Sequence, residues 1–148
     1  MMTPQPGQTI SDLACGTGGF FLTAHEYIAN RYALDNEQKG FLKRATFYGI
    51  VIIDATARLC VMNIFLHGIG EGKSPIAVAD SLPAYQGERF EMVLTNPPFG
   101  KKSIIIMNEE GKSDKENLNY ERQDFCDTTS NKQLNFSQHV QSLLKIQR

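Results

Sequence analysis

The sequence predicts an α/β fold built on a mostly parallel sheet, and three observations support this prediction. Short runs of apolar and β-branched residues alternate with longer segments in which apolar residues recur at helical spacing. Three of the four predicted strands are followed by a polar residue: Asp12, Asp80 and Asn96. A glycine-rich turn, residues 15–19, joins the first strand to the first helix. Ligands of such folds bind beyond the carboxyl ends of the strands, so the same residues define a candidate site.

The composition is that of one globular domain. The chain has 148 residues, of which 41% are hydrophobic and 21% charged. The net charge of −1 gives no basic face, so a nucleic-acid partner would require help from other domains or subunits. Cys15, Cys60 and Cys126 form no CxxC pair, which indicates neither a disulfide framework nor a zinc site and fits a reducing cytoplasm. No apolar run approaches the roughly 18 residues of a membrane span, and no signal-peptide pattern is visible.

The first half of the chain is predicted to contain two strands and two helices. In order, these are a strand at residues 9–11, a helix at 20–32, a strand at 46–53 and a helix from 54 to about 67. A polar stretch, residues 35–39, precedes the second strand. The first helix carries an apolar stripe of Phe21, Ala24 and Ile28, as a core-facing helix requires. The second helix has Asp54 as its expected cap and Gly68 as its expected stop, and its apolar residues are Leu59, Met62, Phe65 and Leu66.

The second half is predicted to contain two more strands and a final helix. The strands lie at residues 76–79 and 90–95, a polar segment at 101–132 is expected to be a long surface loop, and the final helix carries Phe136, Val140, Leu143 and Leu144. If the strands are ordered third, second, first, fourth, the fourth strand has an exposed apolar edge, which is an aggregation hazard. The sheet is therefore expected to be incomplete on its C-terminal side.

Two motifs carry candidate chemistry. In the first, glycines after Asp12 let the backbone turn tightly and approach a ligand. The dinucleotide pattern G-x-G-x-x-G fails because Phe21 stands at its third glycine, and the acidic Asp12 favours a cation or hydroxyl donors over a phosphate. In the second, two prolines end a strand, so the amide of Asn96 stands on a stiff backbone ahead of the ring of Phe99. That arrangement suits a flat molecule with an amino group.

The two motifs together resemble a known family. Acidic-x-Ala-Cys-Gly-Thr-Gly-Gly-Phe at residues 12–20, followed by Asn-Pro-Pro-Phe at 96–99, resembles the amino-methylating DNA methyltransferases that use S-adenosylmethionine. Further similar stretches lie at residues 56–60, 62–63, 66–68, 80–82 and 131–136. Together they resemble the modification subunit of a type I restriction–modification system, a DNA adenine methyltransferase. The resemblance implies a Rossmann-like S-adenosylmethionine-dependent methyltransferase fold, with residues 1–148 as part of the catalytic domain.

The resemblance also implies a role for each candidate site residue. The cofactor's methionine part would be wrapped by Asp12, Ala14, Cys15, Gly16, Thr17 and Gly18, with Asp12 near its amino group. Asp80 would accept a hydrogen bond from the cofactor's adenine. Asn96 and the carbonyl of Pro97 would accept hydrogen bonds from the amine of a flipped target adenine, with Pro98 next in the rigid motif and Phe99 stacked on the base. The implied partners are DNA and the specificity and restriction subunits. In this family a separate subunit recognises the target DNA sequence, so this chain does not specify it.

The chain departs from the family pattern in two respects. The family usually has an acidic residue at the end of the second strand, where it holds the cofactor's ribose, and that position falls on Val51. Because a charge-assisted hydrogen bond contributes about 1.5–3 kcal/mol, we expect the chain to bind S-adenosylmethionine weakly or not at all. The family's helical N-terminal region and Phe-x-Thr-Pro segment are also missing, so a truncated fragment is expected.

Three alternatives remain open from the sequence. A protein glutamine methyltransferase also uses Asn-Pro-Pro beside a side-chain amide, but it usually has Tyr in place of Phe99 and lacks the type I-like stretches. An inactive remnant could keep only subunit-contact surface, and Val51 favours this alternative for the isolated chain. The third alternative is a non-specific Rossmann binder, which the presence of both motifs in register disfavours.

Overall fold

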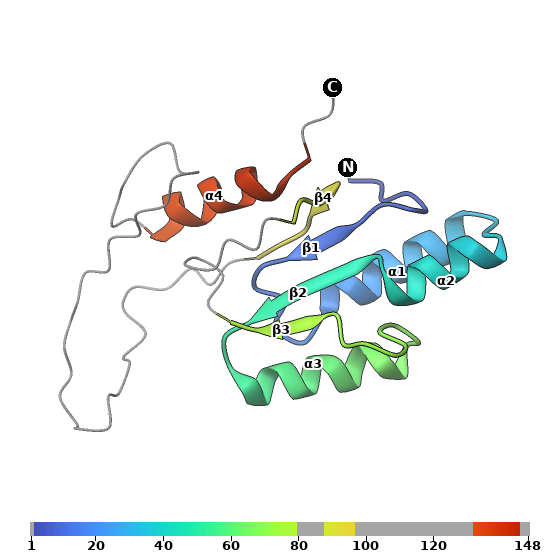
Figure 1. Ribbon diagram of the computed structural model, residues 1–148, viewed down its shortest axis with the longest axis horizontal. Coiled ribbons are helices and arrows are strands. Elements are labelled where there is room, and N and C mark those ends of the chain that lie inside the picture. Colours follow the sequence, from blue (N-terminus) through green and yellow to red (C-terminus); the bar gives the residue numbers. More distant parts are fainter. Residues whose placement is uncertain (1, 80–87, 97–131, 146–148) are drawn as a thin grey trace.

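The computed structural model describes residues 2–79, 88–96 and 132–145, with side chains from Phe136 onward in the last segment. In chain order its elements are β1 (Ile10–Asp12), α1 (Gly19–Arg31), α2 (Asn36–Arg44), β2 (Phe47–Val51), α3 (Asp54–Leu66), β3 (Ile76–Val78), β4 (Met92–Val93) and α4 (Lys132–Leu143). The strands form one parallel sheet in the order β3-β2-β1-β4 (Figure 1). The predicted fold class is thus confirmed, and the strands have the order that the sequence analysis considered as a condition. None of the described helices has the length and hydrophobicity needed to cross a membrane.

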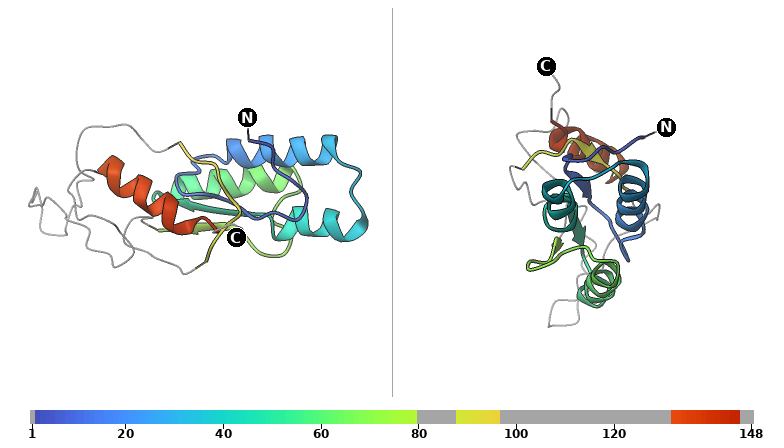
Figure 2. Two further views of the ribbon diagram at one scale, coloured as in Figure 1. Left: turned by 90° about the horizontal axis from the view of Figure 1, so that it is seen from above. Right: turned by 90° about the vertical axis from the view of Figure 1, so that its right-hand side faces the viewer.

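Helices cover both faces of the sheet, with α1 and α3 on one face and α4 on the other (Figure 2). Successive residues of a strand point to opposite faces, and β2 shows this directly. Val51 belongs to the core cluster under α1 and α3, while Ile50 belongs to the cluster under α4. The first cluster includes Ile10, Phe21, Ile28, Cys60 and Ile64. The second includes Leu13, Phe90 and Leu143, with Phe136 and Val140 packed against it.

Gly49 allows the helix layer to approach the sheet closely. A Cβ atom at this position of β2 would lie only 2.8 Å from Cys15 Sγ, from Ile76 Cδ1 and from the Phe21 ring. Contacts that short cannot be relieved without moving the backbone or three packed side chains. The missing side chain of Gly49 therefore sets the spacing between β2, the loop after β1 and α1.

The helix α2 lies where the sequence predicts only a polar stretch at residues 35–39. Asp35 and Gln38 form a reciprocal capping box at its start, with N–H donors 2.8 and 3.2 Å from the two side-chain oxygens. Leu42 is the only residue of α2 that is buried. One buried position gives almost no apolar periodicity, so no helix was predicted for this stretch. The capping box was the available signal.

The boundary between β2 and α3 also differs from the prediction. The predicted strand at 46–53 ends at Val51, and Ile52 and Ile53 are exposed. Asp54 does not cap α3, because it is the first helical residue and its carboxylate pairs with Arg58 at 2.7 Å. The side chains that α3 buries are Ala57, Cys60 and Ile64. Its predicted apolar residues, Leu59, Met62, Phe65 and Leu66, are instead 53–75% exposed, so α3 is apolar on two faces.

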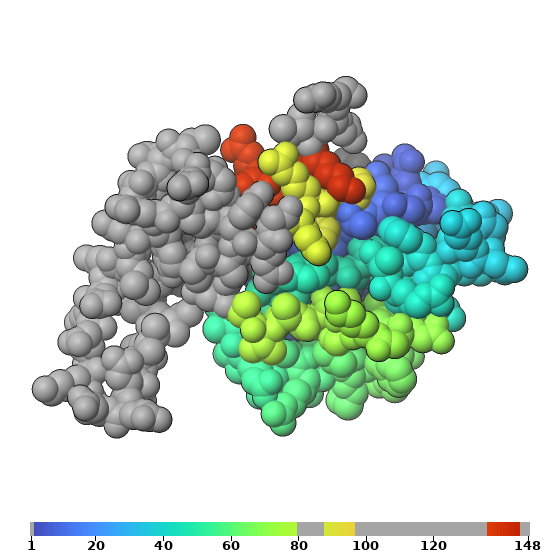
Figure 3. Space-filling view, viewed as in Figure 1, coloured from blue at the N-terminus to red at the C-terminus, as the bar shows by residue number. Residues whose placement is uncertain are grey.

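The chain after α4 pairs with the residues just before β4, at the edge that was expected to be exposed. β4 itself is shorter than the predicted strand at 90–95. The backbone that follows α4 runs parallel to the residues before β4, with Phe90 opposite Leu144. The Phe90 N–H donates to the Leu143 carbonyl at 2.8 Å, and the Lys145 N–H donates to the Phe90 carbonyl at 2.9 Å. In the space-filling view β4 and α4 lie together on the side of the molecule away from β3 and α3 (Figure 3).

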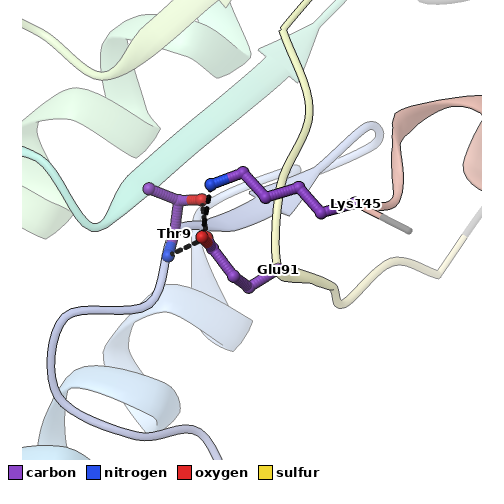
Figure 4. A network of polar contacts seen from close by, with 3 residues as sticks. All are labelled: Thr9, Glu91 and Lys145. Atoms are coloured by element: carbon purple, nitrogen blue, oxygen red, sulfur yellow. Dashed lines mark hydrogen bonds and ion pairs between the residues drawn. The ribbon is translucent and has the colours of Figure 1, made fainter. Parts of the chain in front are cut away.

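The carboxylate of Glu91 joins three segments that are distant in sequence (Figure 4). It accepts hydrogen bonds from the Thr9 N–H at 2.7 Å and from the Thr9 hydroxyl, and it pairs with the Lys145 ammonium. Burial raises the pKa of Glu91, but the donors of Lys145 and Thr9 outweigh burial and lower the pKa to about 2. The charged form of Glu91 therefore stabilises the folded chain.

We expect Glu91→Gln to weaken the fold and to reduce its sensitivity to acid. Because the folded-state pKa of Glu91 is depressed to about 2, its stabilisation is present above the ordinary pKa of about 4.3 and is lost as the pH falls towards 2. The substitution should lower the free energy of unfolding at pH 7 by about 1–2 kcal/mol, allowing for partial exposure. Urea denaturation at several pH values measures this.

Glu71→Gln provides the matched control. Among the described residues, the Glu71 side chain makes an exposed ion pair with Arg44 at 3.9 Å and no other polar contact, so its loss should change stability by less than about 0.5 kcal/mol. An unchanged acid slope in Glu91→Gln would contradict the assigned role of Glu91.

Candidate functional site

The candidate site lies at the carboxyl edge of two neighbouring strands. β1 and β4 are parallel, with Ser11 opposite Val93, and the Leu94 N–H donates to the Ser11 carbonyl at 2.9 Å. The loop that begins after Asp12 and the exposed Asn96 therefore leave the same edge of the sheet from adjacent strands. The two motifs, which are far apart in sequence, are side by side at their starting points.

Asp12 is a desolvated carboxylate at the end of β1. Its exposed fraction is 2%, and Oδ1 accepts a hydrogen bond from the Ala14 N–H at 3.0 Å. Burial raises the pKa of Asp12, while the Ala14 N–H and the nearby Thr95 hydroxyl oppose that rise. The Thr95 hydroxyl is buried and makes no hydrogen bond of ordinary geometry within the described residues. A positively charged group beside Asp12 would compensate its desolvation.

The glycine-rich loop turns back on itself before α1 begins. The Cys15 N–H donates to the Ile50 carbonyl of β2 at 3.2 Å, and the Gly18 N–H donates to the Cys15 carbonyl at 2.7 Å. Gly16 and Gly18 have φ values of +53° and +85°, which favour glycine. Gly18 is also the N-cap of α1 and offers no side-chain cap. The first turn of α1 therefore has backbone N–H groups without a side-chain partner from the cap.

The end of β2 offers no hydrogen-bond acceptor from a side chain. Val51 is buried in the first core cluster, and the two residues after it are isoleucines. Asp54 is the first acidic residue beyond the strand, and its carboxylate is already paired with Arg58. In the sequence, the nearest acidic side chain to the end of β2 therefore belongs to the first residue of α3, three positions beyond Val51.

The structure brings most of the predicted loop residues to one edge of the sheet. The described residues there are Asp12, Ala14, Cys15, Gly16, Thr17, Gly18 and Asn96. Asp80, Pro97, Pro98 and Phe99 lie outside the described residues. Two residues at the site have no role in the sequence prediction: Thr95, beside Asp12, and Asn63, whose side-chain amide donates to the Thr17 carbonyl at 2.9 Å. The first is one position before the Asn96 motif, and the second is a helical residue with no local signal of a long-range contact.

A parallel sheet with a glycine-rich loop after its first strand and an Asn-Pro-Pro-Phe motif after the neighbouring strand defines a Rossmann-like methyltransferase domain. Comparison with known families makes this specific. The chain belongs to the N-6 DNA Methylase family, whose model matches residues 1–147.

The curated relatives are methylase subunits of type I restriction enzymes. The chain is 32% identical to the StySPI methylase subunit of Salmonella potsdam and 32% identical to the EcoKI methylase subunit of Escherichia coli (strain K12), in each case over 95% of this chain and 26% of the relative. The chain thus spans about a quarter of the length of these relatives.

Solved structures show the same relationship. The crystal structure of the EcoKI M protein matches with a TM-score of 0.75 and 32% identity, over 95% of this chain and 28% of that chain. A structure described for complex assembly and conformational transition of the type I R-M system matches with a TM-score of 0.73 and 27% identity, over 97% of this chain and 27% of that chain. The predicted fold and family are confirmed.

We expect Gly18→Ala to destabilise the chain more than an alanine at another positive-φ glycine. A Cβ at Gly18 would lie 2.9 Å from Ile64 Cγ2 and 3.1 Å from Cys60 Sγ, so overpacking of about 1–3 kcal/mol adds to backbone strain of about 1–2 kcal/mol. Gly72→Ala is the control, because Gly72 has φ +88° but nothing within 4 Å of the added atom. Urea denaturation compares the two, and equal losses of stability would show that α3 does not pack closely on the loop.

Proposed function

We propose that this chain is the cofactor-binding and base-binding core of a DNA adenine methyltransferase subunit. The reaction is methyl transfer from S-adenosylmethionine to the exocyclic amine of an adenine flipped out of DNA. The partners are the specificity and restriction subunits of a type I restriction–modification system. The chain covers about a quarter of its relatives, so the complete reaction is a proposal about the larger assembly in the cytoplasm.

One observation carries this proposal. β1 and β4 are adjacent and parallel, so the loop that starts at Asp12 and the motif that starts at Asn96 leave one edge of the sheet as neighbours. A methyl donor bound by the loop and an acceptor amine bound at Asn96 could then meet in line. Positioning of two reactants in this way is a large part of the catalysis of a displacement reaction.

The residues of the loop fit the methionine part of S-adenosylmethionine. The buried carboxylate of Asp12 has a raised pKa and lacks a cation among the described residues around it, which suits the ammonium group of the cofactor. The turn formed by Gly16 and Gly18 leaves room for close approach, because a Cβ at Gly16 would meet nothing within 4 Å. We assign Ala14, Cys15 and Thr17 to the same binding loop, and Asp80 to the cofactor's adenine.

Asn96 and the residues that follow it would prepare the target base. The amine of adenine is a poor nucleophile because its lone pair is delocalised into the ring. Two acceptors, the Asn96 side chain and the Pro97 carbonyl, would accept hydrogen bonds from the two amine hydrogens. These bonds would shift the nitrogen towards tetrahedral geometry and free its lone pair for attack. Pro98 keeps the motif rigid, and Phe99 stacks on the base. When bound, S-adenosylmethionine supplies an electrophilic methyl group on its sulfonium.

The end of β2 does not fit the cofactor's ribose. Val51 is apolar and buried, and the nearest acidic residue in the sequence, Asp54, lies three positions further on in an exposed ion pair with Arg58. The Val51 position itself therefore lacks the charge-assisted hydrogen bonds usually made there. This observation favours a second candidate function, a remnant that keeps subunit contacts without methyl transfer. Weak binding of S-adenosylmethionine is common to both candidates, and only the activity measurement separates them.

We expect Asn96→Ala to reduce methyl transfer by about 10²–10³-fold, as does loss of one oxyanion-type contact, with cofactor affinity unchanged. The assay follows transfer of a labelled methyl group from S-adenosylmethionine to unmethylated DNA with the specificity subunit added. Asn96→Asp is the matched variant, since it keeps an acceptor oxygen and should retain more activity.

Other outcomes of this assay point elsewhere. Equal transfer by the unmodified chain and Asn96→Ala would refute the role of Asn96. Transfer to a glutamine-containing peptide instead of DNA would support the glutamine methyltransferase, and no transfer at all would support the remnant.

We expect Val51→Glu to raise the affinity for S-adenosylmethionine by about 10- to 100-fold, the equivalent of one charge-assisted hydrogen bond. Isothermal titration calorimetry measures the affinity. Val51→Met fills the same space without a polar atom and should bring no gain. Low-micromolar affinity of the unmodified chain, or an equal gain in Val51→Met, would overturn this explanation.

A further inference from the structure

Helix α3 packs against the glycine-rich loop. Three residues on one side of the helix, Cys60, Asn63 and Ile64, each lie against a different loop residue. The Cys60 Sγ lies 3.9 Å from the Cys15 Sγ, and both cysteines are free and buried. The Asn63 amide donates to the Thr17 carbonyl at 2.9 Å. Ile64 packs so closely that a Cβ on Gly18 would come within 2.9 Å of it.

The Asn63 contact differs from the other two because it acts on a peptide group. The carbonyl of Thr17 and the N–H of Gly18 belong to the same planar peptide unit. Asn63 holds the carbonyl end of this unit, and the Cys15 carbonyl holds its N–H end at 2.7 Å. A peptide plane held at both ends resists rotation, although Gly18 on its own has wide conformational freedom.

We propose that Asn63 is a positioning residue for S-adenosylmethionine, acting through the Thr17–Gly18 peptide. This inference rests on the proposed function. Asn63 does not touch the cofactor in this scheme. It fixes the peptide that leads into Gly18, the N-cap of α1, and thereby the directions of the loop N–H groups on either side of that peptide. Preorganised donors bind a ligand without first losing conformational freedom, so the loss of Asn63 should weaken binding of the cofactor.

The test measures the loop and the cofactor separately. In the unliganded chain, NMR amide exchange of Gly18 should quicken about three- to tenfold in Asn63→Ala, as the loss of one hydrogen bond predicts. The Ile10 N–H, which donates to the Thr46 carbonyl at the start of β1, should keep its exchange rate. Affinity for S-adenosylmethionine, measured by calorimetry in the unmodified and Val51→Glu backgrounds, should fall by a similar three- to tenfold factor.

Two further variants make the result specific. Asn63→Asp keeps the size of the side chain but replaces the donor with an acceptor, so it should lower the affinity at least as much as Asn63→Ala. Asn30→Ala removes an exposed asparagine from α1 and should change neither measurement.

Unchanged exchange of Gly18 in Asn63→Ala would overturn the proposal whether or not the cofactor binds. Faster exchange with unchanged cofactor affinity would overturn it as well, because the loop would then be anchored for another reason. If no variant binds S-adenosylmethionine, including Val51→Glu, the proposed function fails and the positioning role falls with it, while the exchange of Gly18 still decides whether Asn63 anchors the loop.

Discussion

The double pairing of β1 is the constraint on which the rest of the structure depends. This strand has only three residues, all of them buried, yet it pairs with β2 on one side and β4 on the other. Parallel neighbours require crossover connections, so the helices between the strands must pack on the faces of the sheet. The same pairing places the loop after β1 and the motif after β4 at one edge. Fold and candidate site therefore have a common origin in the central strand.

Features encoded in short stretches of sequence could be predicted. Apolar runs ended by Asp12 or Asn96 identify strands and the edge of the sheet where they end, and the alternation with helices predicts parallel pairing. Features that depend on tertiary contacts could not be predicted. The exposure of Leu59 and Phe65 depends on which face of α3 meets the sheet, and a helix that is apolar on both faces gives no sign of this. The pairing just before β4 depends on Leu144, which lies opposite Phe90 although the two residues are far apart in sequence.

The candidate site shows the same division. Asp12 and Asn96 could be selected because each ends a predicted strand, and backbone topology brings such positions to one edge of the sheet. Asn63 could not be selected, since nothing near it in sequence shows that its amide reaches Thr17. The burial of Val51 was likewise not visible, although its missing charge was. The result is an asymmetric site, with a desolvated acid at the loop and an apolar residue at the end of β2.

The bonds of Glu91 also bear on the order in which the chain folds. Thr9 and Glu91 are separated by 82 residues in sequence, and closing so long a loop carries a large entropic cost. The local pairings of β1 with β2 and of β2 with β3 involve shorter loops, so they are expected to precede the contact with Glu91 in the folding reaction. An interaction that forms after the transition state acts mainly on the unfolding rate. The contacts of Glu91 would then form late in folding. They would slow the unfolding of the sheet at β4 and leave the folding rate unchanged.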